Sequence, residues 1–166
     1  MKIIRHPHAG SVGAAIAIGS FDGVHLGHQA ILAHVERKSR SLGLRAAVLT
    51  FEPLPREFFH PAAAPPRLTC LTERLDALSR ASIQVAYVQR FDAAFAAISA
   101  EQFEERLPDR YGARWVAVGE DFRYGARRMG DLQSLREAIG LILEHRREDS
   151  LCALPPDAER ELVVVG

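Results

Sequence analysis

Short apolar runs alternate along the chain with segments in which apolar residues recur every three or four positions. The runs are typical of strands buried in a sheet, and the periodic segments are typical of helices with one apolar face. We predict strands at 14–18, 45–51, 83–88 and 115–118, and a short edge strand at 162–165. Because strands and helices alternate with short links, we expect a parallel sheet with helices on both faces.

The periodic segments predict four helices, at 29–42, from Leu71 to Leu78, from the capping box Ser99-x-x-Gln102 onward, and from Leu132 to Ile142 with Asp131 as N-cap. Residues 52–70 are rich in proline and alanine and predict a long loop. Structureless loops of this length are uncommon in compact domains, so this loop is a functional candidate.

The residues from Gly19 to His28 connect the first predicted strand to the helix that follows. Free N–H groups and the positive end of the helix dipole favour an anion at such a junction. His25 and His28 add donors, while Gly23 permits a tight turn and Gly27 leaves room for a bulky phosphate. The arrangement predicts a site for a nucleotide polyphosphate.

The string Phe21-Asp22-Gly23-Val24-His25-Leu26-Gly27-His28 resembles the signature of one family module. This is the N-terminal, FMN-adenylylating module of the bacterial bifunctional riboflavin kinase/FAD synthetases, within the nucleotidylyltransferases that have a His-x-Gly-His phosphate site. Further blocks match in order at 50–59, 66–69 and 118–125. The resemblance implies a Rossmann-like α/β fold of the nucleotidylyltransferase type. It also implies an enzyme that transfers AMP from ATP to FMN and yields FAD and pyrophosphate.

Residue chemistry and the resemblance together predict the site. The catalytic candidates, as donors to phosphate oxygens, are His25, His28 and Arg128. The ATP-binding candidates are Gly19, Ser20, Phe21, Asp22, Gly23, His25, Gly27 and His28. The flavin-binding candidates are Phe51, Pro53, Pro55, Phe58, Arg67, Thr69, Asp121, Phe122 and Tyr124. No dedicated metal cage is visible, and we expect Mg²⁺ to enter with the nucleotide phosphates.

Each assignment has a plainer alternative. His25 and His28 would be surface or helix-cap residues. Arg127 and Arg128 would then form a solvated basic turn, and Phe122 would belong to the core. The aromatic residues of 51–59 would form a lid that serves only the fold, and 67–69 would be a helix-start loop with Thr69 or Thr72 as cap.

Composition narrows the possible partners. The chain has 166 residues, with 21 basic and 21 acidic side chains, so we expect a single domain and no general binding to nucleic acid or membrane surfaces. No apolar run approaches the roughly 20 residues of a membrane helix. Cys70 and Cys152 show no metal spacing, and no secretory signal precedes them, so we expect reduced thiols in a cytoplasmic protein.

The resemblance covers roughly residues 12 to 138, and the chain departs from the family pattern after about residue 156. Family members continue into a Ser-Ser-Thr-x-Ile-Arg block that binds ATP phosphates, whereas no serine, threonine or lysine follows Ser150 here. We therefore expect a truncated or degenerate C-terminal end, a missing riboflavin kinase domain, and weak or absent catalysis. Two alternatives are a non-catalytic flavin- and nucleotide-binding module and an adenylyltransferase for another small phosphate. The blocks around 58–59 and 121–122 argue against the second of these.

Overall fold

The computed structural model of the chain describes residues 1–8, 12–139 and 162–165. Within these residues, six strands form one sheet in the order β1-β4-β3-β2-β5-β6, and every neighbouring pair is parallel. The strands are β1 Lys2–Ile4, β2 Ala14–Ile18, β3 Arg45–Glu52, β4 Val85–Arg90, β5 Ala113–Gly119 and β6 Leu162–Val165. The four central strands are mostly buried, as expected for a parallel sheet covered on both faces.

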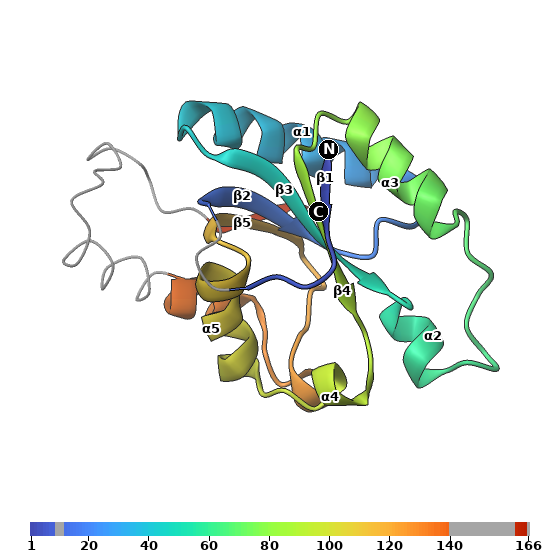
Figure 1. Ribbon diagram of the computed structural model, residues 1–166. Coiled ribbons are helices and arrows are strands. Elements are labelled where there is room, and N and C mark those ends of the chain that lie inside the picture. The colour runs from blue at the N-terminus through green and yellow to red at the C-terminus, as the bar shows by residue number, and fades with distance from the viewer. Residues whose placement is uncertain (9–11, 140–161, 166) are drawn as a thin grey trace.

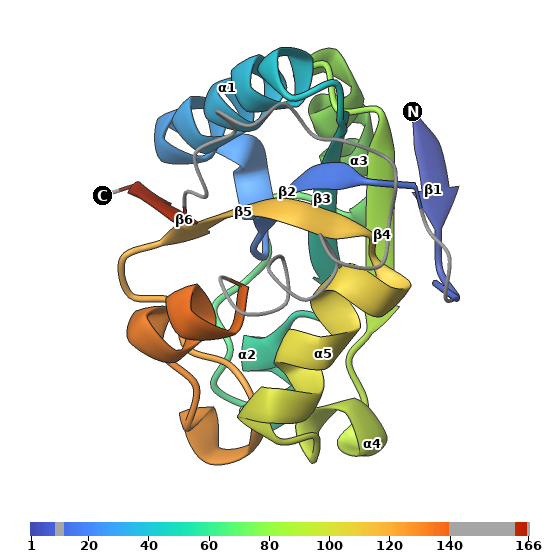
Figure 2. The same ribbon diagram turned by 90° about the vertical axis from the view of Figure 1, so that its left-hand side faces the viewer.

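Helices cover both faces of this sheet (Figure 1; Figure 2). The main helices are α1 Leu26–Ser41, α3 Leu71–Arg80 and α5 Ala100–Arg110, with two short ones, α2 Pro55–Phe59 and α4 Ala93–Ala96. Leu32 of α1 and Leu78 of α3 pack into one apolar cluster. Phe103 of α5 and Leu135, from a last helical stretch at 132–139, pack into the cluster on the opposite face. The predicted two-sided α/β fold is therefore confirmed.

The predicted elements are largely confirmed, with several corrections. The first long helix begins at Leu26, three residues earlier than predicted, because His25 accepts the N-terminal capping bond. The predicted loop at 52–70 is not free of structure, since it contains α2, whose first turn is closed by a hydrogen bond from Leu54 N–H to Glu57. Strand β1 and helix α4 were not predicted, because runs of three and four residues show no clear periodicity. Ile142 and Cys152 lie outside the described residues.

The strand order creates a switch point between β2 and β5. From β2 the chain moves through α1 to β3 and through α3 to β4, always toward the same edge of the sheet. It then returns through α5 to β5, on the other side of β2. The segments that leave β2 and β5 therefore diverge, and ligands of open α/β sheets bind in the crevice at such a point. The turn with the two histidines follows β2, and the 119–128 segment follows β5.

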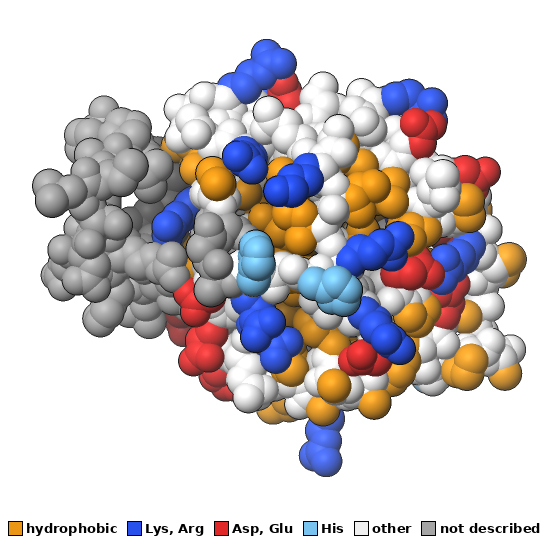
Figure 3. Space-filling model, in the orientation of Figure 1, with side chains coloured by type: hydrophobic (Ala, Val, Ile, Leu, Met, Phe, Trp, Pro, Cys, Tyr) orange, Lys and Arg blue, Asp and Glu red, His pale blue; other side chains and the backbone are white. Residues whose placement is uncertain are grey.

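Charged side chains of both signs are scattered over the face shown in Figure 3, with apolar side chains between them. This mixed surface agrees with the balance of 21 basic and 21 acidic residues. Within the described residues, no helix combines the length and the apolar character needed to cross a bilayer.

Candidate active site

The turn after β2 has an unusual backbone. Phe21, Gly23 and Val24 have φ angles of 52°, 73° and 39°, within or beside a short 3-10 helix at Asp22–Val24. Positive φ is uncommon for residues other than glycine, and for a β-branched residue such as valine it is a strained conformation. The side chains of Phe21 and Val24 are buried, so packing holds the turn in this shape. Phe21 can therefore contribute only its backbone to a nucleotide site.

The two histidines stack against each other at the start of α1. Their ring centroids are 3.7 Å apart, and the backbone N–H of His28 donates to Nδ1 of His25 over 3.4 Å. A Cβ atom on Gly27 would lie 3.3 Å from the His25 ring, which is a tight contact, so glycine leaves space beside that ring. Burial, together with the charge on His25, lowers the pKa of His28 to about 4. His28 is therefore a neutral donor at pH 7 until an anion arrives.

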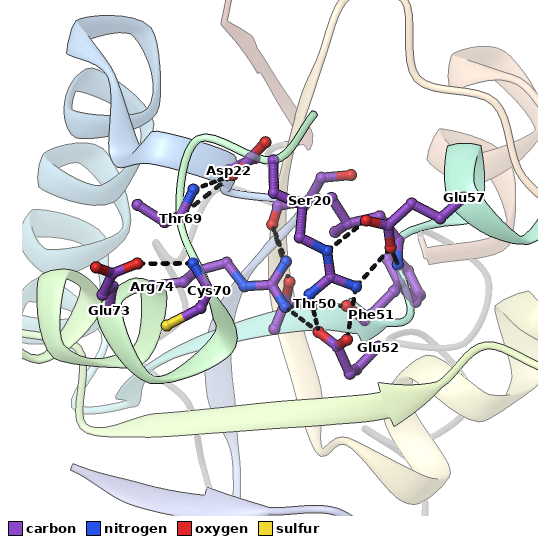
Figure 4. Close-up of polar contacts among 12 residues, drawn as sticks. Ser20, Asp22, Thr50, Phe51, Glu52, Glu57, Thr69, Cys70, Glu73 and Arg74 are labelled. Carbon is purple, nitrogen blue, oxygen red and sulfur yellow. Dashed lines mark hydrogen bonds and ion pairs between the residues drawn. The ribbon is translucent and has the colours of Figure 1, made fainter. Parts of the chain in front are cut away.

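Asp22 fastens this turn to the residues that precede α3 (Figure 4). Its carboxylate accepts hydrogen bonds from the backbone N–H groups of Leu68 at 3.0 Å and Thr69 at 2.9 Å, and from the Thr69 hydroxyl at 3.1 Å. The Thr69 hydroxyl oxygen in turn accepts from the Gly23 N–H at 3.0 Å. Burial raises the pKa of Asp22, but these hydrogen bonds outweigh it and the pKa is lowered. Asp22 and Thr69 thus join the predicted nucleotide residues to the predicted flavin residues.

The alternative reading of Thr69 or Thr72 as a helix cap is wrong, because the N-cap of α3 is Cys70. Its N–H donates to Glu73 at 2.8 Å, which closes the first turn without either threonine. The hydroxyl of Thr69 is therefore available for Gly23 and Asp22.

Two arginines and two glutamates form a connected group of ion pairs, which we call the Arg–Glu network: Glu52, Glu57, Arg67 and Arg74. Figure 4 shows the two glutamates and Arg74. Arg67 pairs with Glu57 and, at 2.7 Å, with Glu52. The hydrogen bonds of Arg67 to Glu57 and Glu52 raise the pKa of Arg67. The hydrogen bond between Arg67 and Glu57 also lowers the pKa of Glu57. The guanidinium of Arg67 is thus engaged by carboxylates, and its predicted contact with flavin stays a prediction.

Sequence reasoning missed Glu52, Glu57 and Arg74 as members of this group. Arg74 is 1% exposed and reaches Glu52 at 2.8 Å. A signal was present, because position 74 lies on the same helical face as Leu71 and Leu78, where a charged residue is unexpected. Glu52 and Glu57 lie within the matched block at 50–59, but their partners are distant in sequence.

Aromatic rings connect the predicted flavin residues of the two loops. Phe58 meets Phe91 with a centroid distance of 5.4 Å, and Phe91 meets Phe95 at 5.5 Å. The contacts continue from Phe95 to Phe103, from Phe103 to Tyr124, and from Tyr124 to Phe122. Phe51 joins the group through Phe91 and Phe95. Phe91, Phe95 and Phe103 were not predicted, since they belong to no matched block and only folding brings them between the two loops.

The segment after β5 folds back on itself. Tyr124 is buried, and its hydroxyl contacts Glu104 and, at 3.0 Å, Ser134. A Cβ atom on Gly130 would overlap the Tyr124 ring. Packing therefore explains much of Tyr124. Phe122 is partly buried and also packs against the core cluster, as its plainer alternative expected, whereas Asp121 is exposed. Burial and the bond to Glu104 raise the pKa of Tyr124.

Arg127 and Arg128 follow in this segment, with φ angles of 57° and 59°. Both side chains are exposed, and within the described residues neither has an ion-pair partner, whereas Arg123 pairs with Asp131 at 3.3 Å. Two consecutive arginines in a left-handed conformation are strained, and strain of this kind is common at functional sites. No hydrogen bond between described residues joins Arg128 to the two histidines, so its catalytic role stays a prediction.

A family model described as FAD synthetase matches residues 8–144. The chain belongs to the FAD synthetase family. It is similar to the bifunctional riboflavin kinase/FMN adenylyltransferase of Haemophilus influenzae, with 39% identity over 96% of this chain and 53% of that protein. It is also similar to the protein of the same name from Escherichia coli strain K12, with 41% identity over 83% of this chain and 46% of that protein. The chain thus spans about half the length of these curated relatives.

The fold of the chain also resembles the crystal structure of a macrolide-efflux protein from Streptococcus pneumoniae. The TM-score is 0.66 with 22% sequence identity, over 83% of this chain and 47% of that one. At this identity the likeness concerns the fold alone.

Three of the four matched blocks lie at the carboxyl ends of β2, β3 and β5, and the 66–69 block precedes α3. Pro53 and Pro55 leave β3 and start α2, and the Glu52–Pro53 peptide bond is cis. Asp22 and Thr69 bring the nucleotide block and the 66–69 block into direct contact. Residues 151–156, after which the chain departs from the family pattern, lie outside the described residues.

Proposed function

We propose that this chain is an FMN adenylyltransferase domain, which transfers AMP from ATP to FMN and forms FAD and pyrophosphate. The observation that carries the proposal is the stacked pair His25 and His28 at the start of α1, beside the β2–β5 switch point. Family membership and the names of the curated relatives support it. Because those relatives are about twice as long, we further propose that a riboflavin kinase domain completes the natural protein, which we place in the cytoplasm.

ATP is proposed to bind at the turn from Gly19 to His28. Apart from the N–H of His28, which donates to His25, the first N–H groups of α1 lack intrahelical partners, so they and the helix dipole attract phosphate oxygens. His25 and His28 would donate further hydrogen bonds, and Gly27 leaves space above the His25 ring. Arg128, exposed and without an ion-pair partner among the described residues, supplies positive charge from the side of β5.

FMN is proposed to bind between the 51–59 segment and the 121–124 segment. The chain of aromatic rings from Phe58 to Phe122 supports this position, since flat rings stack well on aromatic walls. Pro53 and Pro55 would stiffen the wall, and Arg67 and Thr69 hold the loop in place.

In the reaction, a phosphate oxygen of FMN attacks the α-phosphorus of ATP, and pyrophosphate leaves. The protein acts by aligning two anionic groups and by stabilising the charge that develops on the phosphates. Among the described residues, no cluster of His, Cys, Asp or Glu could hold a metal ion. The carboxylate of Asp22 already accepts hydrogen bonds from the backbone N–H groups of Leu68 and Thr69. We therefore propose that Mg²⁺ enters bound to the nucleotide phosphates.

The proposal is tested by mixing the chain with ATP, Mg²⁺ and FMN and measuring FAD by chromatography, with FMN fluorescence to follow binding. We expect the FMN fluorescence to be quenched on binding and FAD to form, because the stacked histidines and the aromatic rings are present in this chain.

His28→Ala should weaken ATP binding, measured by calorimetry, without affecting FMN binding. Binding of both ligands without any FAD would instead indicate a non-catalytic flavin- and nucleotide-binding module. The absence of FMN quenching and of binding heat would contradict the flavin assignment altogether.

A further inference from the structure

We propose that Arg74 is a positioning residue that fixes the nucleotide turn relative to the flavin loop. The inference rests on the proposed function and concerns a side chain that touches neither ligand. Arg74 lies on α3 and is 1% exposed, and Figure 4 shows its guanidinium extending from that helix toward the ends of β2 and β3.

The guanidinium joins the two halves of the site directly. It donates to the carbonyl oxygen of Ser20 at 2.9 Å, to that of Phe51 at 3.2 Å, and to the Glu52 carboxylate at 2.8 Å. Ser20 opens the turn that carries the histidines, whereas Phe51 and Glu52 end β3 and begin the flavin loop. Because the guanidinium is planar and rigid, these three bonds fix the spacing of the two backbones.

A purely structural role does not explain a charge at this position. Burial lowers the pKa of Arg74, although an arginine stays charged in proteins. Leu75 and Leu78 beside it bury apolar side chains, and an apolar residue at position 74 would pack without the desolvation of a charge. Arginine instead provides several directed donors to backbone oxygens whose positions matter for the two substrates.

The network extends the influence of Arg74 into the loop. Glu52 forms ion pairs with both Arg74 and Arg67, and Arg67 also forms an ion pair with Glu57 of α2. From the other side, Asp22 holds Leu68 and Thr69. Losing Arg74 should therefore let the turn and the loop shift relative to each other, which would misalign the FMN phosphate and the α-phosphorus of ATP.

The test compares Arg74→Met, Arg74→Lys and Arg80→Met with the wild-type chain. Arg80 lies on the same helix, is exposed, and forms a surface pair with Asp76, so Arg80→Met is a matched control. Arg74→Met should fold, because Ser20 O still accepts from the Thr50 hydroxyl and Glu52 still pairs with Arg67. Lysine keeps the charge but offers a single nitrogen, so it should restore only part of the function.

The readouts are FMN affinity by fluorescence, affinity for a non-hydrolysable ATP analogue by calorimetry, and kcat and KM for FAD formation. All are measured well below the melting temperature of each variant. For Arg74→Met we expect both affinities to fall by about tenfold and kcat to fall as well, since hydrogen bonds to a charged group are strong. The affinities and kcat of Arg74→Lys should lie between those of Arg74→Met and wild type. The affinities and kcat of Arg80→Met should match those of wild type.

Wild-type affinities in a folded Arg74→Met variant would overturn the inference and leave the proposed function intact. A loss of FMN affinity alone would also overturn it, because Arg74 would then act on the loop only. If neither Arg74 variant folds, the side chain serves stability and the inference fails. If the wild-type chain binds neither ligand, the proposed function fails first, which distinguishes the two failures.

Discussion

At the scale of single residues, the site is shaped by how its polar groups are surrounded. His28 is half-buried beside His25 and Phe21, and its Nδ1 atom has no hydrogen-bond partner among the described residues. Asp22 and Thr69, by contrast, are fully engaged with each other and with the backbone. Because the Nδ1 atom is buried, a contact between His28 and an incoming anion would have to use its other ring nitrogen, Nε2.

His28 should make the fold sensitive to mild acid. Its pKa falls from 6.5 to about 4 on folding, so the unfolded chain binds its proton more tightly. The stability that neutral His28 provides is present above pH 6.5 and is lost as the pH falls toward 4. In His28→Gln, the free energy of unfolding from urea titrations should decline less steeply between pH 6.5 and 4.5. His60→Gln, at the exposed end of α2, is the control, and equal slopes in all three proteins would contradict the prediction.

A substitution at Arg128 should change the rate of FAD formation without lowering the stability of the fold. Its φ of 59° suits glycine, and relieving a left-handed arginine recovers about 1–2 kcal/mol, part of which the flexible unfolded glycine offsets. Arg128→Gly should therefore unfold at the same or slightly higher denaturant concentration while forming FAD more slowly. Arg127→Gly, with a φ of 57°, is the paired variant. A clear loss of stability in Arg128→Gly would show that its side chain holds the loop rather than phosphate.

At the scale of elements, the 52–70 segment is held at several points. The Arg–Glu network anchors its first and last parts, and Asp22 anchors Leu68 and Thr69 to the turn after β2. The short helix α2 forms between these anchors. The segment is thus an ordered wall beside the site, although its composition resembles that of a loop.

Thr69→Val should loosen this wall. The substitution keeps the shape of the side chain but removes the acceptor for Gly23 N–H and the donor to Asp22. We expect a loss of about 1–2 kcal/mol in the free energy of unfolding, because partly buried groups lose their partners. FMN affinity by fluorescence should fall as well. Thr69→Ser retains the hydroxyl and should bind FMN as wild type does, and identical behaviour of the valine variant would rule out a role for this contact.

At the scale of the whole molecule, the order of the strands decides where the site lies. The chain moves from β2 toward β4 and then returns to β5, so the segments after β2 and β5 separate around one crevice. The helices after β2 and β5 cover opposite faces of the sheet, with Leu32 in one apolar cluster and Leu135 in the other. The histidine turn follows β2 and the arginine segment follows β5, so this topology places both at the switch point.

Local patterns were enough for much of this protein. Apolar runs and helical periodicity predicted the four central strands, the edge strand β6 and the helices that cover the sheet, because burial on a sheet or a helix face imposes those periods. The capping box at Ser99 and Gln102 and the N-cap at Asp131 are confirmed. Such caps depend on neighbours three residues apart, which a sequence displays directly. The histidine turn was recognisable for the same reason.

Contacts between distant residues were decided only by the tertiary structure. Arg74 meets Ser20 across 54 positions, Asp22 meets Thr69 across 47, and Phe103 meets Tyr124 from different elements. No local period encodes such pairs, because they depend on the strand order and on which helix covers which face. The sequence by itself therefore determined the central strands, the main helices and the family, and it marked the turn that carries the two histidines. The tertiary structure decided which side chains join the two halves of the site, since a hydrogen bond or a ring contact requires three-dimensional proximity rather than a pattern along the chain.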